Sequence, residues 1–397
     1  MTPGDANKVV ESLRKGIPPD GQVRHFTVGR TSETSQLLGR LEEQKSGPLL
    51  LHANFGAGKS HLLRFIREAA LEQGFAISWV ELDAKSAVRF NRMDQILGAI
   101  CRGIEIPGCT GERGVRSLFN LACTSIEEHR RLGAASSFWH EMTNGWEWDF
   151  SEAFDSPAMF IALRAWRCGG RSVQDLIEDW MFQPWNYRSQ RKQLYMRLVE
   201  DLRRYFRDPR ADWQFFADDI FRFDRQAYQQ SWAMLRDIET ICLESGLKGF
   251  IILFDEFEKA LVDLNNIKYQ EAAFWNLFQF YSGKQFSGMT YFAVTPEFVH
   301  RCKTLLLQSG RWDYDYSRFD KLPSFEMSPL SREDMELLAE RITDAHGVAY
   351  GWQPRGICKP HLTQAVRQSL GLNVPDQTRQ AIRAVVTTLD RLLEDGQ

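Results

Sequence analysis

One glycine-rich segment, Ala53–Ser60 (ANFGAGKS), constrains the fold of this chain more than any other feature. The apolar run Pro48–Leu51 precedes it, and the amphipathic run Leu62–Ile66 follows. A buried strand, a glycine turn and a helix N-terminus in this order are typical of a phosphate-binding P-loop. Glycines allow successive backbone N–H groups to point at phosphate oxygens, and the helix directs the positive end of its dipole at the same charge.

The side chains of this segment have different predicted roles. Lys59 is expected to reach the outer phosphates of a nucleotide, and the Ser60 hydroxyl to ligate Mg²⁺. A chance glycine turn before a helix is the alternative, but strand, loop, Lys-Ser pair and helix all agree with one another. The predicted nucleotide-binding residues here are Gly56, Ala57, Gly58, Lys59, Ser60 and His61.

A second segment, Phe250–Glu256, is an apolar run that ends in two carboxylates. Because it is apolar on both faces, it predicts a central parallel strand. Asp255 is then placed to hold Mg²⁺ through water, and Glu256 to polarise an attacking water, with Glu258 as the second candidate for that base. Alone, the Asp-Glu pair would favour a helix N-cap followed by a first-turn acid. Together with Lys59 and Ser60 it favours hydrolysis of ATP.

Composition and charge narrow the class of protein. The 397 residues suffice for two or three domains, and the formal net charge of -3 gives no global nucleic-acid signature. We expect a soluble, cytoplasmic protein, since no signal peptide or long apolar span is present. The seven cysteines form no CxxC or Cys/His cluster, so neither a disulfide framework nor a zinc site is indicated.

The order of apolar patterns predicts three parts. Residues 1–85 and 246–330 are expected to form the ATPase core, and residues 86–245 a helical, aromatic-rich insert. Residues 331–397 are expected to form a helical lid. Ser331 should cap its first helix, because acids follow in the first turn.

The predicted strand Tyr291–Thr295 follows the carboxylate strand by one helix. Thr295 is expected beside the γ-phosphate as a polar sensor, and a threonine that caps the turn before Pro296 is the equally weighted alternative. One arginine of the next loop could reach a neighbouring subunit's nucleotide, because a guanidinium group stabilises charge on the transferring phosphoryl group. A solvated surface arginine is the alternative for each of them. In order of preference the candidates are Arg318, Arg311 and Arg301.

The best candidate for a nucleic-acid contact is the stretch from Arg188 to Arg210 in the insert. It holds eight basic residues and three acidic ones, and the spacing of its apolar residues places the bases away from the buried stripe of a helix. A charged helix face with ion pairs is the alternative, which we weight somewhat higher. Contact with DNA phosphates would involve Arg188, Arg191, Lys192, Arg203, Arg204 and Arg207.

Several segments resemble the BrxD-type ATP-binding proteins of BREX phage-defence systems. That family is similar to AAA+ ATPases of the origin-recognition and helicase-loader type. The resemblance implies ATP binding, a role in bacterial defence against phage DNA, and a helicase-like partner. The segments that carry it are Ser12–Pro18, Val28–Arg30, Gly56–Leu63, Gly249–Glu256 and Pro329–Ser331.

The resemblance also implies roles for four more residues. Gly29 and Arg30 match the segment that lies near the adenine in such ATPases. Residues 378–383 resemble a lid segment that usually reads Thr-Pro-Arg, but the proline is absent here. Arg379 and Arg383, one helical turn apart, are therefore alternative lid arginines for the γ-phosphate.

These inferences predict an α/β protein: a P-loop NTPase of the additional-strand, AAA+-like kind, with a parallel sheet, a long helical insert and a helical lid. With ATP and Mg²⁺ as cofactors, it would act as an ATPase switch or loader on DNA or a helicase-like partner. It would work as a homo-oligomer, without a membrane. The alternative is an ATP-gated scaffold that hydrolyses ATP weakly and organises a defence complex. A small-molecule kinase is disfavoured, because kinases of this fold need no water-activating acid.

Overall fold

The structure is a computed structural model. It describes residues 1–54, 56–82, 88–109, 111–132, 138, 142, 153–182, 228–262, 264, 266–308, 310, 315, 317–354, 358–371 and 376–395.

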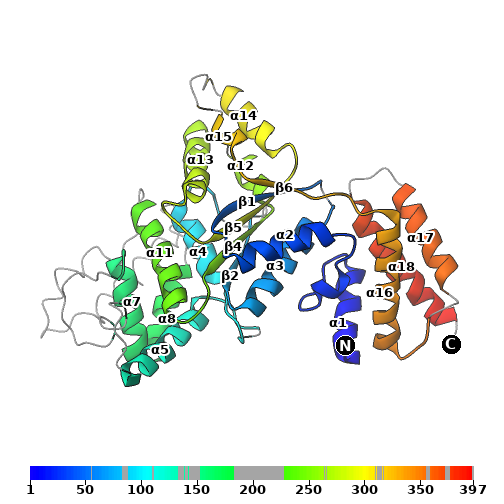
Figure 1. Cartoon of the computed structure of the whole chain (residues 1–397), viewed down its shortest axis with the longest axis horizontal. Helices are drawn as coiled ribbons and strands as arrows, with labels where there is room; N and C mark the ends of the chain where they lie inside the picture. The colour runs from blue at the N-terminus through cyan, green and yellow to red at the C-terminus, as the bar shows by residue number, and fades with distance from the viewer. Residues whose placement is uncertain are drawn as a thin grey trace, which may run out of the picture.

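A six-stranded, mostly parallel sheet forms the centre of the chain (Figure 1). Its strands lie in the order β3-β2-β4-β5-β1-β6, and within this sheet β3 runs antiparallel to β2 while the other pairs are parallel. The predicted mixed α/β class is therefore confirmed. The strands are β1 (Gly47–His52), β2 (Ala76–Glu81), β3 (Ile104–Glu105), β4 (Phe250–Asp255), β5 (Met289–Val294) and β6 (Ser324–Glu326).

Strand β5 lies between β1, which leads into the glycine-rich segment, and β4, which carries the two carboxylates. All three run parallel, so their carboxyl ends meet at one edge of the sheet. In sheets of this kind, ligands bind outside the carboxyl ends of the strands. The sheet order thus brings the Lys59 segment, Asp255 and Thr295 to the same edge.

Helices cover both faces of the sheet, which explains why β4 and β5 are buried along their whole length. Leu51, Ile251 and Leu253 pack on one face, against α2 (Thr31–Glu42) and α3 (Lys59–Gln73). The opposite face packs against four other helices. They are α4 (Met93–Arg102), α11 (Tyr228–Glu244), α12 (Phe257–Val262) and α13 (Ile267–Ser282).

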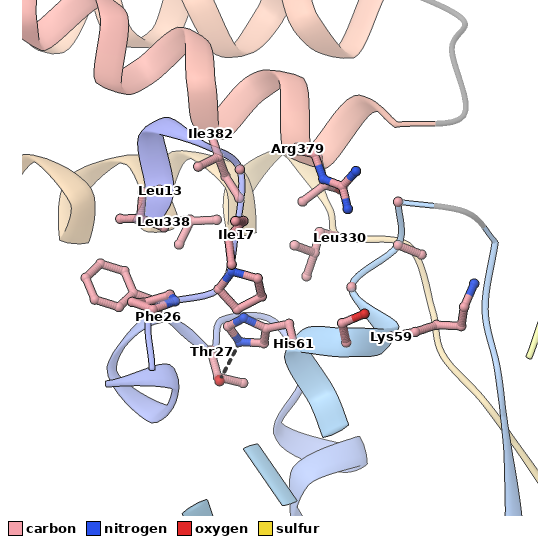
Figure 2. Close-up of a pocket in the computed structure, with 18 of the residues that line it drawn as sticks. Leu13, Ile17, Phe26, Thr27, Lys59, His61, Leu330, Leu338, Arg379 and Ile382 are labelled. Atoms are coloured by element: carbon pink, nitrogen blue, oxygen red, sulfur yellow. Dashed lines mark hydrogen bonds between the residues drawn. The ribbon is translucent and has the colours of Figure 1, made fainter. Parts of the chain in front are cut away.

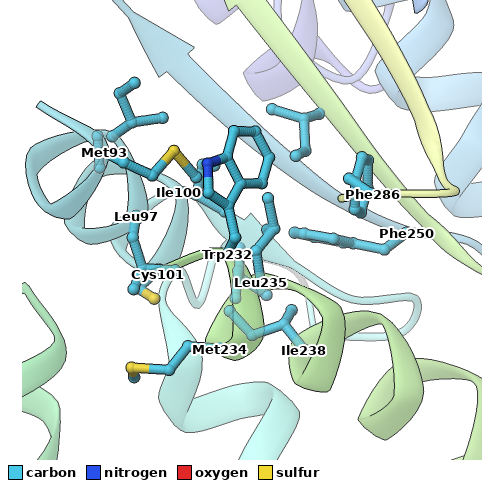
Figure 3. Packing of buried hydrophobic residues seen from close by; sticks show 14 of the residues in the cluster. Met93, Leu97, Ile100, Cys101, Trp232, Met234, Leu235, Ile238, Phe250 and Phe286 are labelled. Carbon is cyan, nitrogen blue, oxygen red and sulfur yellow. The ribbon is translucent and has the colours of Figure 1, made fainter. Parts of the chain in front are cut away.

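The helices of the predicted insert that the structure describes gather beyond the β2 side of the sheet (Figure 1). Their packing depends on α11, whose Trp232, Leu235 and Ile238 lie between α4 and Phe250 of the sheet (Figure 3). This segment therefore extends the core of the sheet rather than forming a core of its own. Besides α4 and α11, its helices are α5 (Val115–Leu132), α7 (Pro157–Cys168) and α8 (Arg171–Phe182).

The short helices α14 (Phe298–Gln308) and α15 (Ser317–Asp320) connect β5 to β6. Among the described helices, none combines the length and the apolar character needed to cross a membrane.

A separate bundle holds both ends of the chain (Figure 1). It consists of α16 (Arg332–Tyr350), α17 (Lys359–Gly371), α18 (Gln377–Asp395) and the first helix, α1 (Pro3–Arg14). Ser331 caps α16 in a capping box with Asp334, so the predicted N-cap of this helix is confirmed. Arg14 of α1 donates to the Asp390 carboxylate at 2.8 Å. Residues 15–28 then lead back to the glycine-rich segment, through the 3₁₀ helix η1 (Val23–Phe26).

The segment that leads from the bundle back to the sheet needs a glycine at position 29. The φ of Gly29 is +62°, and a Cβ at this position would overlap the carboxyl group of Asp334, which completes the capping box of α16. Gly21 has a similar φ of +75° but open space around it. Substitutions at the two glycines therefore distinguish the cost of backbone strain from the cost of steric overlap.

We predict that Gly29→Ala destabilises the protein more than Gly21→Ala. Gly21→Ala should cost about 1 kcal/mol for a left-handed residue. Gly29→Ala should cost about 1 kcal/mol more, because it also displaces the helix cap. Thermal unfolding of both variants beside the wild type measures the difference. Equal losses of thermal stability in the two variants would show that the Asp334 side chain can move aside at no cost and that its contact with Gly29 is unimportant.

Candidate functional site

The glycine-rich segment forms a tight loop between β1 and α3. Gly56 and Gly58 have φ values of +76° and +96°, in the left-handed region that favours glycine. Gly58 is the N-cap of α3 and makes no side-chain cap bond. The helix N-terminus therefore faces the loop, in the arrangement that binds anions.

Lys59 begins α3, and its side chain is only 10% exposed. Its ammonium group donates to the carbonyl oxygens of Ala53 at 3.0 Å and Asn54 at 3.4 Å, and lies 3.9 Å from Oε1 of Glu258. Burial lowers the pKa of Lys59, and four nearby carboxylates oppose that shift: Glu258, Asp255, Glu256 and Glu297.

Ser60 and Asp255 meet at the carboxyl end of β4. The Ser60 side chain lies close enough to the Asp255 carboxylate to lower its pKa, and the Glu256 N–H donates to Oδ1 of Asp255 at 2.9 Å. Asp255 is 6% exposed, and this burial raises its pKa. Mg²⁺ commonly takes one or two protein oxygens and completes its shell with phosphates and water. The hydroxyl and carboxylate pair fits that requirement, although within the described residues no three His, Cys, Asp or Glu side chains gather as a metal site.

The two glutamates after Asp255 occupy different environments. Glu256 has a φ of +55°, rare for a residue with a side chain, and pairs with Lys259; its side chain is 33% exposed. Strained backbone of this kind clusters at functional sites. Glu258 is 13% exposed, and its Oε2 is buried without a hydrogen-bond partner. Burial raises the pKa of Glu258, opposed by Lys59.

One cavity joins these polar groups to an apolar wall (Figure 2). The wall comes from the segment after α1 and from the bundle of α1, α16, α17 and α18, which is called the lid bundle below. The cavity therefore lies where this bundle meets the sheet. An apolar wall beside a phosphate-sized polar end fits a nucleotide, whose base is flat and whose phosphates are charged. The apolar residues are Leu13, Ile17, Pro18, Pro19, Phe26, Val28, Leu330, Leu338 and Ile382.

Sequence reasoning did not assign this wall to the site. Residues 12–18 and Pro329–Ser331 entered only as parts of a resemblance, and residue Ile382 only within the lid segment. The signal in the sequence was Ile17, an apolar residue within the turn Gly16–Pro19. In the structure the Ile17 side chain is 44% exposed. An apolar side chain in a turn before the glycine-rich segment is a candidate for contact with a base.

The two candidate lid arginines lie in different places. Arg379, in the first turn of α18, lines the cavity. Arg383 is not among the lining residues and donates instead to the carbonyl oxygen of Lys15 at 2.6 Å. Both pack on Gly16, where a Cβ would overlap the Arg379 side chain. The geometry favours Arg379 as the arginine that can reach a ligand.

Arg30 connects three parts of the site. Its side chain is 4% exposed, and it donates to the carbonyl oxygens of Ala57 at 2.7 Å and Ser328 at 3.0 Å. Glu33 lies 3.4 Å away. Arg30 therefore ties the glycine-rich loop to the segment that leads into the lid. Gly29, the other residue expected near the adenine, lies between the lining residues Val28 and Arg30 but does not line the cavity itself.

The remaining sequence candidates are placed as follows. Thr295 directly follows β5 at the same sheet edge, and its hydroxyl oxygen is buried without a hydrogen-bond partner. Arg318, in α15, is exposed and lies over the ring of Phe278 at 4.0 Å. Arg301, in α14, is also exposed. Arg311 and the basic stretch from Arg188 to Arg210 lie outside the described residues.

His61 lines the cavity and is partly buried. Its Nε2 shares a hydrogen bond with the Thr27 hydroxyl at 2.9 Å (Figure 2). Burial, assisted by the nearby charges of Arg30 and Arg64, lowers the pKa of His61 to about 4. The unfolded chain then binds more protons than the folded chain between pH 6.5 and 4, so stability falls as the pH falls through that window.

We predict that His61→Gln makes the protein less sensitive to acid. The shift corresponds to about 2 kcal/mol of stability lost between pH 7.5 and pH 5 in the wild type. As the pH falls to 5, the thermal midpoint should therefore fall less in His61→Gln than in the wild type. His25→Gln, which changes an exposed histidine, is the control and should retain the wild-type pH dependence. A wild-type pH dependence in His61→Gln would place the titrating group elsewhere.

Comparison with known proteins gives one family. The family of the BREX system ATP-binding protein BrxC/D matches residues 1–130 and 225–397, which include the glycine-rich loop, the carboxylate strand and the lid. No curated protein and no solved structure gives a match. Because the family match covers most of the sequence, the chain belongs to the BREX system ATP-binding protein family BrxC/D.

Proposed function

We propose that this protein is a Mg²⁺-dependent ATPase of the additional-strand P-loop, AAA+-like kind, which acts in defence against phage. One observation carries the proposal: Lys59, the Ser60–Asp255 pair and Glu256 line one cavity whose opposite wall is apolar. The placement of β5 between β1 and β4 supports the additional-strand assignment. The family description supports ATP as the nucleotide.

Each group has a role in this proposal. The glycine loop and Lys59 bind the phosphates, and Ser60 and Asp255 hold Mg²⁺, which would offset the phosphate charge. Glu256 polarises the attacking water, and Thr295 senses the γ-phosphate through a hydroxyl oxygen that has no other partner. Arg379 contacts the phosphates from the lid. Closure of the lid over the base would couple nucleotide binding to a conformational switch.

The wider assembly is also part of the proposal. A homo-oligomer would place an exposed arginine, Arg318 first, against a neighbour's nucleotide. DNA or a helicase-like partner would be the target of the switch, with the basic stretch of the insert as the DNA contact. In the alternative, an ATP-gated scaffold, turnover would be almost absent. The Lys259–Glu256 pair favours that alternative, because it occupies the proposed base.

Lys59→Ala should weaken ATP binding without unfolding the chain. The substitution removes a charge-assisted phosphate contact worth about 1.5–3 kcal/mol, so affinity should fall about 10- to 100-fold. Calorimetric titration with Mg·ATP measures the loss. The control is Lys248→Ala, which changes an exposed lysine two residues before β4, at the opposite sheet edge. Unchanged affinity in Lys59→Ala would exclude a phosphate site at this loop.

Glu256→Gln should keep ATP binding and lose turnover. The amide preserves the shape of the side chain but cannot polarise water as a carboxylate does, so hydrolysis should fall by about two to four orders of magnitude. Phosphate release and nucleotide titration on the same preparation separate the two effects. Normal hydrolysis in Glu256→Gln would assign the base to another residue, and absence of turnover in the wild type under all conditions would favour the scaffold.

A further inference from the structure

Three carboxylates line the phosphate end of the cavity, where their charges would repel a polyanion. Asp255 and Glu256 have roles in the proposed reaction, but Glu258 has none. It lies in the first turn of α12 and lines the same cavity as the glycine loop. Of the carboxylates around Lys59, Glu258 exerts the largest attraction on its charge.

The contacts of Glu258 identify what it does in the nucleotide-free site. Oε1 lies 3.9 Å from the Lys59 ammonium group, in surroundings where neither side chain is more than 13% exposed. Charges this close and this poorly solvated interact strongly, because little water screens them. A phosphate group that binds Lys59 must therefore displace Glu258 or bind beside it.

The carboxylates of the cavity would repel the phosphates of a nucleotide, and few cations are free to offset that repulsion. Of the other cations that line the cavity, Arg30 is held by two carbonyl oxygens and Glu33. Arg379 lies 3.4 Å from Asp376, the residue before α18. A free nucleotide would bring its phosphates against three carboxylates with Lys59 as the nearest cation. A divalent ion bound to the nucleotide reverses this balance, because it brings positive charge into the same space.

We propose that Glu258 is a specificity-determining residue that holds Lys59 in the empty site and makes nucleotide binding depend on a divalent cation. This inference rests on the proposed nucleotide site. Glu258 competes with the phosphates for Lys59, so the free nucleotide is rejected. The magnesium complex is accepted, because its metal compensates the carboxylate.

The test is the affinity for ADP, which avoids hydrolysis, measured in saturating Mg²⁺ and in EDTA. For the wild type we expect affinity to fall at least about tenfold in EDTA. Glu258→Gln keeps the shape and removes the charge, so it should bind ADP at least about fivefold more tightly than the wild type in EDTA. In Mg²⁺ the two proteins should differ by no more than about twofold. Glu297→Gln removes an exposed charge at the same sheet edge and should behave as the wild type.

Three outcomes would overturn the inference. Equal ADP affinities of wild type and Glu258→Gln in EDTA would show that Glu258 does not compete for Lys59. Weaker binding by Glu258→Gln in Mg²⁺ alone would make Glu258 a metal ligand. Unchanged affinity with lost turnover would make it the water-activating base. If Glu258→Gln does not fold, Glu258→Asp, which withdraws the carboxylate by one methylene, should show the same direction of change in EDTA.

Failure of the nucleotide site itself looks different. In that case the wild type binds no ADP even in Mg²⁺, or Lys59→Ala binds it as well as the wild type does. If the wild type binds ADP and Lys59→Ala weakens that binding, the nucleotide site stands. The response of Glu258→Gln then decides the role of Glu258 alone.

Discussion

A buried lysine that needs an anion organises this structure. An ammonium group that is 10% exposed is costly unless polar groups surround it, and Lys59 is held by two loop carbonyls and a carboxylate. The loop carbonyls depend on glycines at positive φ, and the carboxylates depend on β4 ending at the same edge as β1. Loop, strand order and acidic residues therefore form one electrostatic unit, in which a bound phosphate group would compete for the lysine.

The lid bundle matters because it supplies the other half of the cavity. Helix α1 packs on α16 and α18, and the segment after it returns across the site to the glycine loop. Arg30 then links that loop to the start of the lid through two carbonyl oxygens. A ligand that moves the loop would pull on the same guanidinium group that holds Ser328. In the proposed function, a bound nucleotide would therefore act on the lid through this one buried side chain.

The sequence predicted those parts of the site that depend on local chemistry. The strand before Ala53–Ser60, the apolar strand before Asp255 and the Ser331 cap each follow from a few neighbouring residues, and the structure has all three elements. The apolar wall was not predicted, because Leu13 and Ile382 are brought together by packing between the two ends of the chain. The same limit applies to the contact of Glu258 with Lys59, which depends on how α12 leaves the sheet.

A crystal structure with Mg²⁺ and a non-hydrolysable ATP analogue tests the central claim most directly. We predict that Lys59 leaves the carbonyl oxygens of Ala53 and Asn54 and contacts the β- and γ-phosphates. Ser60 and Asp255 should lie at the metal, and the base should lie against Ile17, Leu338 and Ile382. A nucleotide bound elsewhere, or one that leaves Lys59 on its loop carbonyls and Glu258, would contradict that claim.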